Sequence, residues 1–283
     1  MQTESRTAKL NDIHRRLIGS NKMKKTGSIA PNASISSTAV IGKDVTIHDF
    51  VVIKDGAKIG DGVTIEAGSI IYENVVLGNN TFIGAQCIIG ERLLAYLKEE
   101  TYENPATTIG ENSIVRAGTI IYANCSFGAN FQTGNRAVIR EESHFGNNCS
   151  FGTLSQSDGQ IKIGDNCRFH NNVFIATYTT CEDNVHMYPM SCTTDSLHPP
   201  CQKGREGPYL ESGVIIGARV LLLPRVRLGA GSVVAGGSVV SHNVEPNMVV
   251  AGVPAKPIRR KDEVRCHVED RPAWEVAIES LKS

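Results

Sequence analysis

Polar side chains recur in the middle of the chain at intervals of 18 residues, with a histidine beside one of them. Asn135, Thr153 and Asn171 follow one another at this spacing, and His170 comes directly before the last of them. A neutral imidazole near pH 7 can take a proton from an attacking ammonium or hydroxyl group, whereas an asparagine can only orient a substrate or a water. We therefore treat His170, Asn171 and Asn135 as candidate catalytic residues. The alternative is that this histidine lies at a turn of the chain, has no catalytic role and only forms a hydrogen bond with its neighbour.

A six-residue repeat indicates which elements position these side chains. An aliphatic or aromatic residue recurs every six positions from Ile29 to Ile89 without a slip, and the same register returns from Ile109 and from Ile216. A small or β-branched residue follows four positions after each, and Gly, Asn or Asp often falls between, as a tight corner with positive φ favours. Each hexad is therefore one strand and one corner. Three hexads make a triangular coil of about 18 residues, and the chain supplies roughly ten stacked coils.

The repeat also explains most of the eight cysteines. Four of them occupy the small inward position of a hexad and are expected in the core: Cys87, Cys125, Cys149 and Cys167. Cys192 and Cys201 lie near a break in the register, and their roles stay open. Since no export signal precedes them, we expect reduced thiols rather than disulfides.

Two insertions interrupt the register, at residues 91–108 and 194–213. Long excursions from a rigid scaffold commonly carry function. We expect residues 1–28 to form a helical cap, residues 29–250 the repeat domain, and residues 251–283 a tail that ends in a short helix.

The composition excludes some classes of partner. Lys plus Arg equals Asp plus Glu at 29 each, so the net charge suggests neither nucleic acid nor an anionic membrane surface. The first 25 residues lack the apolar core of a secretory signal, and no apolar run is long enough to span a bilayer. These observations predict a cytoplasmic protein with a small-molecule substrate.

The tandem [LIV]-G-x-x-x-x pattern resembles the hexapeptide-repeat acyltransferases. Parallel crossovers are right-handed in about 98% of cases, but the resemblance implies the left-handed exception. The expected fold class is all-β, a left-handed parallel β-helix with short terminal helices and two inserted loops. The resemblance also implies a homotrimer with active sites between chains.

The segments NFQTGNRAVIREE and RFHNNVFIATYT resemble the members of that family that N-acetylate nucleotide-linked amino sugars. In these relatives a T-G-H-x-x-x-I-R-E-like run and an N-N-V-like run line the sugar site. Asn135 stands where relatives often carry a histidine, and His170 is the candidate replacement. The resemblance implies these substrate-binding residues: Thr133, Arg140, Glu141 and Asn172.

The segment that closes the repeats resembles the family's final coils, where a P-x-V-x-[IL]-G-x-G-S-x-V run ends in G-x-P-A-[KR]. Small residues there would leave an outer groove for the pantetheine arm of coenzyme A, and the basic tail offers charge to phosphates. His198 lies in an SLHPP stretch that resembles a Pro-rich loop near the acyl site. The candidate cofactor-binding residues are Ala235, Gly236, Gly237, Gly252, Pro254, Arg259, Arg260 and Lys261.

These observations predict an acyltransferase that moves an acyl group, most simply acetyl, from coenzyme A to the amino group of a nucleotide-linked 3-amino or 4-amino sugar, with no metal. One alternative is O- or N-acylation of an amino acid or a natural-product intermediate. A zinc enzyme like the γ-carbonic anhydrases is a second, but it needs three converging histidines, and His144 and His186 are 42 residues apart, which is not a multiple of 18. A non-catalytic scaffold or ice-binding helix is a third, disfavoured by the irregular faces.

Overall fold

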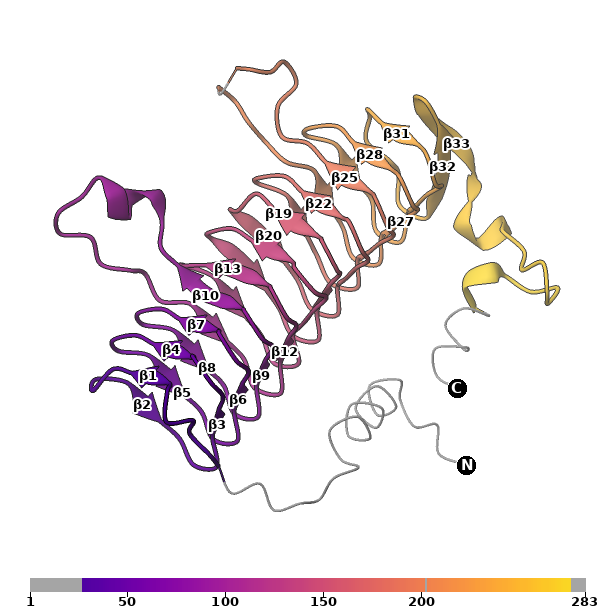
Figure 1. Ribbon diagram of the computed structural model, residues 1–283. Coiled ribbons are helices and arrows are strands. Elements are labelled where there is room, and N and C mark those ends of the chain that lie inside the picture. Colours follow the sequence, from indigo (N-terminus) through magenta and orange to yellow (C-terminus); the bar gives the residue numbers. More distant parts are fainter. Residues whose placement is uncertain (1–26, 202, 276–283) are drawn as a thin grey trace.

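The chain folds into a three-sided prism of stacked coils. The structure, a computed structural model, describes residues 27–201 and 203–275. Each coil contributes one short strand to each of three sheets, and the coils form the left-handed parallel β-helix that the family resemblance implies (Figure 1). Within the described ranges, no helix has the length and apolar character needed to cross a membrane.

Strands of successive coils pair in parallel to form sheets of 11, 10 and 12 strands. The first sheet contains β1 (Ser34–Ile35), β4 (Val52–Ile53), β7 (Ile70–Ile71), β10 (Ile88–Glu91), β13 (Ile120–Tyr122), β16 (Val138–Ile139), β19 (Gln156–Ser157), β22 (Phe174–Ile175), β25 (Cys192–Thr193), β28 (Leu221–Leu222) and β31 (Val239–Val240). The second sheet contains β2 (Val40–Ile41), β5 (Lys58–Ile59), β8 (Val76–Leu77), β11 (Thr108–Ile109), β14 (Ser126–Phe127), β17 (Ser143–Phe145), β20 (Ile161–Ile163), β23 (Thr180–Cys181), β26 (Tyr209–Leu210) and β29 (Arg227–Leu228). The third sheet contains β3 (Thr46–Ile47), β6 (Thr64–Ile65), β9 (Phe82–Ile83), β12 (Ile114–Val115), β15 (Gln132–Thr133), β18 (Ser150–Phe151), β21 (Arg168–Phe169), β24 (His186–Met187), β27 (Ile215–Ile216), β30 (Val233–Val234), β32 (Met248–Gly252) and β33 (Ala255–Arg260).

The register of the sheets follows the 18-residue coil. Phe151 pairs with Phe169, and Ile70 pairs with Ile88, both at this spacing. The third sheet ends in an antiparallel hairpin, in which β33 folds back along β32 and Met248 pairs with Arg260. β32 therefore crosses the expected boundary at residue 250, and the tail continues the sheet.

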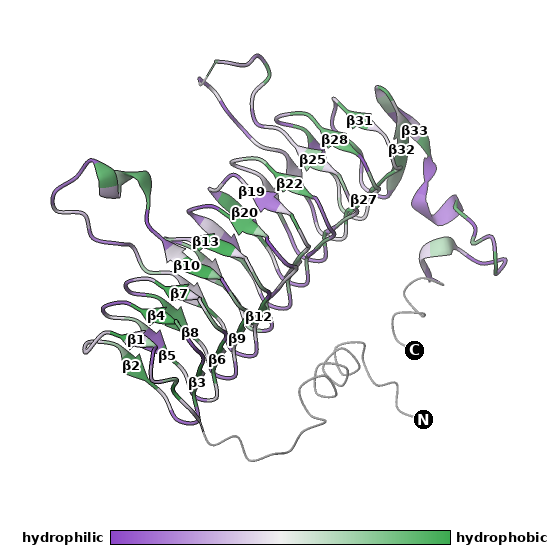
Figure 2. Ribbon diagram, viewed as in Figure 1, coloured by the Kyte–Doolittle hydropathy of each residue, from purple (hydrophilic) through white to green (hydrophobic). Residues whose placement is uncertain are grey.

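The core is a single column of side chains enclosed by the three sheets. The hexad position and the position four residues later both point inward, and Figure 2 shows most of the strands as apolar, with β19 as a hydrophilic exception. The prediction that four cysteines lie in the core is confirmed, because Cys87, Cys125, Cys149 and Cys167 are all buried. Ile29 is an exception to the inward code, since 54% of it is exposed in the first described coil.

Many corners contain a residue with positive φ. Asn is the commonest non-glycine type there, as its tolerance of the left-handed region leads one to expect. Larger side chains of several types occupy many of the other corners, including Leu154 (φ 58°) and Met190 (φ 62°).

Both insertions leave the prism at the same corner, where the chain passes from the first sheet to the second. We call this the loop corner. Residues 92–107, with the 3-10 helix η1 (Leu94–Leu97), connect β10 to β11, and residues 194–208 connect β25 to β26. The two loops project on the same side of the molecule (Figure 1). The second insertion ends earlier than expected, because Leu210 already rejoins the core.

The predicted terminal elements lie mainly outside the described residues. Of the expected cap at residues 1–28, residues 1–26 fall outside them. At the other end, the 3-10 helix η2 (Lys261–Glu263) follows β33, and residues 273–275 are helical, while the rest of the expected terminal helix lies beyond residue 275.

Candidate active site

The residues that the 18-residue spacing singles out do form a column on one corner of the prism. This corner, where the chain passes from the third sheet to the first, is called the His170 corner. The side-chain oxygen of Asn171 accepts a hydrogen bond from the backbone N–H of Thr153 (3.0 Å), and the Thr153 hydroxyl accepts one from the N–H of Asn135 (3.2 Å). The predicted stacking of the three residues is therefore confirmed. These bonds also tie each coil to the next, so the column has a structural role whatever its chemistry.

In the two coils before His170, the equivalent position on the corner is a glycine. Gly134 and Gly152 precede it at 18-residue intervals, and a Cβ atom at either position would lie within 2.5 Å of the next coil's backbone. His170 is free of this restriction, and its ring stacks on that of Tyr188, with centroids 4.6 Å apart and planes 16° apart. The imidazole is half-buried, and aromatic packing holds its orientation.

The surroundings of His170 favour the neutral imidazole. Burial lowers its pKa from the ordinary value, and the positive charge of Arg168 lowers it further. A histidine of this kind is unprotonated at neutral pH, which is the state that a general base requires.

Three of the predicted cofactor residues, Ala235, Gly236 and Gly237, lie on the same corner as the predicted catalytic ones. Backbone hydrogen bonds connect the corner from coil to coil, from Met190 N–H to Asn171, from Arg219 N–H to Pro189, and from Gly237 N–H to Ala218. The corner residues in order are Asn135, Thr153, Asn171, Pro189, Ala218 and Gly236. Three coil spacings separate Asn171 from Gly236, or about 14 Å at the usual distance between strands.

The upper part of this corner, formed by the last coils of the β-helix, is open. Ala235, Gly236 and Gly237 directly follow β30, and a Cβ atom at Gly237 would meet nothing within 4 Å. Gly236 is exposed, and a Cβ atom there would approach the carbonyl oxygen of Ala218 at 3.1 Å. The absence of side chains leaves backbone groups accessible along the corner.

The basic residues follow on the hairpin that ends the third sheet. Gly252 (φ 102°) is the last residue of β32, and Pro254 lies in the turn before β33. The Gly252 N–H donates to the Ser238 hydroxyl at 3.1 Å. Arg259 and Arg260 are exposed at the end of β33. Burial lowers the pKa of Lys261, whose ammonium lies over the Trp274 ring at 5.5 Å from its centroid.

The remaining predicted substrate-binding residues are placed differently. Thr133 is buried in the core, where its hydroxyl accepts a hydrogen bond from the Arg116 N–H at 2.9 Å. Asn172 is exposed on the His170 corner with φ 57°, which by itself accounts for an asparagine there. Arg140 and Glu141 lie on the loop corner and form an ion pair at 2.7 Å. The structure thus separates Arg140 and Glu141 from His170.

The loop corner carries a chain of charged groups that sequence analysis missed. Arg140 also contacts Asp158 at 3.2 Å, and Arg205 of the second insertion pairs with Asp195, which in turn accepts a hydrogen bond from Thr177. Burial alone would raise the pKa of Asp195, but the hydrogen bonds from Thr177 and Arg205 and the charge of Arg205 hold it below its ordinary value. These contacts fasten the second insertion to the prism.

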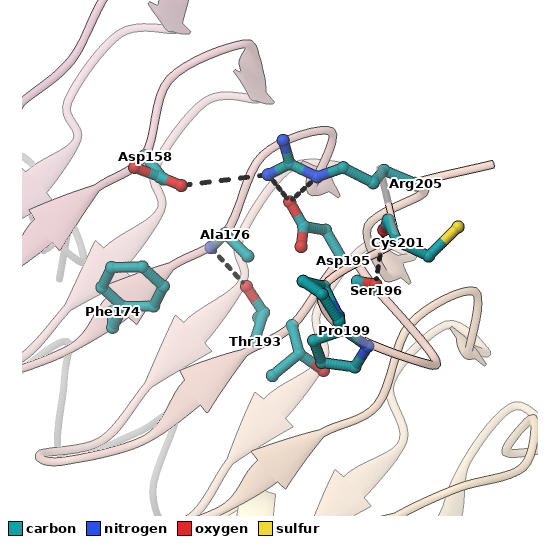
Figure 3. A pocket seen from close by; sticks show the side chains of 11 residues that line it. Asp158, Phe174, Ala176, Thr193, Asp195, Ser196, Pro199, Cys201 and Arg205 are labelled. Carbon is teal, nitrogen blue, oxygen red and sulfur yellow. Dashed lines mark hydrogen bonds and ion pairs between the residues drawn. The ribbon is translucent and has the colours of Figure 1, made fainter. Parts of the chain in front are cut away.

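A pocket of about 350 Å³ opens between this insertion and the first sheet. Phe174 of β22 lines it on the prism side, and Pro199, Pro200 and Cys201 line it from the loop (Figure 3). His198 is exposed in the same loop but does not line the pocket.

The 18-residue spacing of the coils could have identified several of these residues from the sequence. Tyr188 follows His170 by 18 residues, Asp158 follows Arg140 by 18, and Asp195 follows Thr177 by 18. Arg205 lies in an insertion without register, so no spacing in the sequence points to it. As for metals, residues 27–201 and 203–275 contain no group of three His, Cys, Asp or Glu side chains placed to hold an ion, and His144 and His186 lie in different sheets.

Comparison with known proteins matches the repeats to transferase families. Residues 56–91 match the bacterial transferase hexapeptide family (six repeats), and residues 38–73 match the hexapeptide repeat of succinyl-transferase. The chain is also similar to the UDP-N-acetylglucosamine acyltransferase of Arabidopsis, with 21% identity, a TM-score of 0.53, and coverage of 82% of this chain and 74% of that one. This likeness shows the β-helix fold.

Two curated relatives are both named 2,3,4,5-tetrahydropyridine-2,6-dicarboxylate N-acetyltransferase. The one from Clostridium perfringens (strain SM101 / Type A) is 42% identical over 79 residues, which is 28% of this chain and 32% of the relative. The one from Staphylococcus aureus (strain JH9) is 37% identical over 82 residues, which is 29% of this chain and 33% of the relative. The similarity thus spans about a third of the length of these relatives.

Proposed function

We propose that this hexapeptide-repeat β-helix is an acyltransferase that moves an acetyl group from coenzyme A to the amino group of a nucleotide-linked 3-amino or 4-amino deoxysugar. The observation that carries the proposal is that the candidate catalytic residues and the small residues predicted to bind coenzyme A lie on the same corner of the prism, which we call the shared corner. A neutral histidine and a polar column occupy its middle, and an open stretch of small residues leading to a basic hairpin occupies its upper part. An extended ligand with an anionic end and a reactive end suits this arrangement.

In the proposed reaction the amine nitrogen attacks the thioester carbonyl, so a C–N bond forms and the C–S bond breaks. His170 takes the proton that the nitrogen loses and returns it to the departing sulfur, which leaves as the thiol of coenzyme A. Asn171 and Asn135 orient the acceptor through their exposed amide groups. Backbone amides of the corner stabilise the oxyanion of the tetrahedral intermediate.

Coenzyme A would lie along the upper part of the His170 corner. Its pantetheine amides would pair with backbone groups near Ala235, Gly236 and Gly237, which present no large side chains. Its phosphates would meet Arg259 and Arg260. In a homotrimer, the assembly that the sequence resemblance implies, the corner would face a neighbouring subunit, which is how the exposed column would be shielded from water.

A second acceptor class is favoured by the curated relatives. Both are named for N-acetylation of a dicarboxylate that is not a sugar. The same corner chemistry would serve an amino acid or a natural-product intermediate, because only the acceptor differs.

The test is mass spectrometry of the products after incubation with acetyl-CoA and a panel of nucleotide-linked amino sugars and amino acids. The proposal predicts a mass increase of one acetyl group on one of the amino sugars. Acetylation of an amino acid alone would move the assignment to the second class, and no transfer to any amine would contradict the proposed function. Mass spectrometry is preferred because eight protein thiols would obscure a colorimetric thiol assay.

A further inference from the structure

The pocket beside the second insertion has the features of a site for a flat ring. Its floor and walls are largely apolar, formed by Phe174, Ala176 and the Pro199–Pro200 pair. Figure 3 shows the Phe174 ring on one side and Pro199 on the other, with Ala176 and Thr193 between them. Phe174 is 38% exposed although it is a large apolar residue, so its ring is available for stacking.

The rim of the pocket supplies hydrogen-bond acceptors but disfavours phosphate. The charged lining residues are Asp158, Asp195 and Arg205, which sum to one negative charge. Arg205 is bound to Asp195, so its guanidinium is already engaged. A ligand that enters the pocket should therefore be uncharged where it meets the rim.

Asp158 has an oxygen with remaining capacity for a ligand. Its Oδ1 accepts a hydrogen bond from Arg140 at 3.2 Å, whereas its Oδ2 forms an ion pair with the Arg205 guanidinium at 4.0 Å, a distance too long for a hydrogen bond. The side chain is 38% exposed. Oδ2 can accept a hydrogen bond from a ring N–H or a ribose hydroxyl of a bound molecule.

The pocket also lies close enough to His170 for one ligand to reach both. Phe174 is four residues beyond His170 in the same coil, so the two backbones are at most about 14 Å apart. A ligand placed on Phe174 can extend across the first sheet to the His170 corner. The basic hairpin, by contrast, follows several coils later.

We propose that this pocket binds the nucleoside end of the acceptor, with the base between Phe174 and the Pro199–Pro200 pair and a base N–H or ribose hydroxyl donating to Asp158. The proposal rests on the proposed function for the identity of the acceptor. It identifies Phe174 and Asp158 as specificity-determining residues, and it leaves the diphosphate outside the negatively charged pocket, directed toward the His170 corner.

The test measures binding without turnover. Isothermal titration of the full chain with uridine, thymidine, guanosine and adenosine, and with their 5′-diphosphates and coenzyme A, would identify the ligand. We expect one nucleoside diphosphate to bind, Phe174→Ala to weaken it at least tenfold by loss of stacking, and Asp158→Asn to weaken it severalfold. Phe50→Ala and Glu206→Gln, which change exposed residues that do not line the pocket, should leave the affinity unchanged.

Each other outcome has a definite meaning. If Phe174→Ala weakens only coenzyme A, the pocket holds the adenosine of the cofactor and the proposal is wrong. It is also wrong if both pocket variants bind the nucleoside diphosphate as well as the wild type does, even if acetyl transfer to a sugar is observed. If a nucleoside diphosphate binds as expected but no amine is acetylated, the pocket assignment stands and the proposed function falls.

Discussion

The rings of His170 and Tyr188 stack face to face, with centroids 4.6 Å apart, on successive coils of the β-helix. The contact covers one face of the imidazole. Tyr188 lies one coil beyond His170 in the register. The β-helix therefore holds the Tyr188 ring in place, and the ring in turn fixes the orientation of the proposed base.

Replacement of His170 by alanine should lower kcat/KM at least about 100-fold, the lower end of what a general base typically contributes. Stability should change little, because the imidazole is only partly buried. His144→Ala is the matched control, since His144 is an exposed histidine of the second sheet. Steady-state kinetics with thermal unfolding would check both variants, and full activity of His170→Ala would show that the amine arrives already deprotonated.

The pH dependence of kcat/KM should follow the lowered pKa of His170. Burial and the charge of Arg168 both favour the neutral imidazole, so activity should be retained below the ordinary histidine value of about 6.5 and fall only at more acidic pH. Arg168→Gln removes one of these causes, and the acidic limb should move toward higher pH. A limb that stays in place in this variant would mean that another group titrates.

Substitutions at Tyr188 should separate ring packing from its hydroxyl. Tyr188→Phe keeps the stacking ring and should retain nearly full activity. Tyr188→Leu removes the flat surface, and we expect kcat to fall about tenfold with a smaller change in KM, because a misplaced base costs rate more than binding. Equal kinetics for the two variants would argue against positioning by the ring.

A bulky residue at Gly237 should block the proposed coenzyme A groove. Gly237 and Gly213 have almost the same φ, 74° and 73°, so phenylalanine at either position pays a similar backbone penalty of about 1–2 kcal/mol. Only Gly237 lies on the His170 corner. We predict that KM for acetyl-CoA rises about tenfold in Gly237→Phe and not in Gly213→Phe; similar KM values would place the cofactor elsewhere.

The six-residue period carries nearly all the information needed for the fold. Inward positions such as Ile53 and Val51 recur because each hexad must bury the same two positions, and small side chains such as Cys149 often occupy the second of them. The same register places Thr133 inside, where the structure finds it, although the family resemblance suggests a substrate-binding role for it. A ligand role for Thr133 would require access to the interior of the coil.

The loops could not be predicted in this way. Residues 194–208 have no register, so the contact of Arg205 with Asp195 and the pocket beside it depend on how the loop folds back. The connection between Arg140 and the pocket likewise appears only once the loop corner is built. Spacing locates residues on the prism, but only three-dimensional packing brings an insertion against it.

The most direct test of the central claim is a crystal structure of the protein with coenzyme A bound. The shared corner predicts the pantetheine arm alongside Ala235 and Gly236, the phosphates near Arg259 and Arg260, and the sulfur within reach of the His170 imidazole directly or through one water. Coenzyme A on another face of the prism, or with its sulfur remote from His170, would contradict the assignment of this corner as the active site.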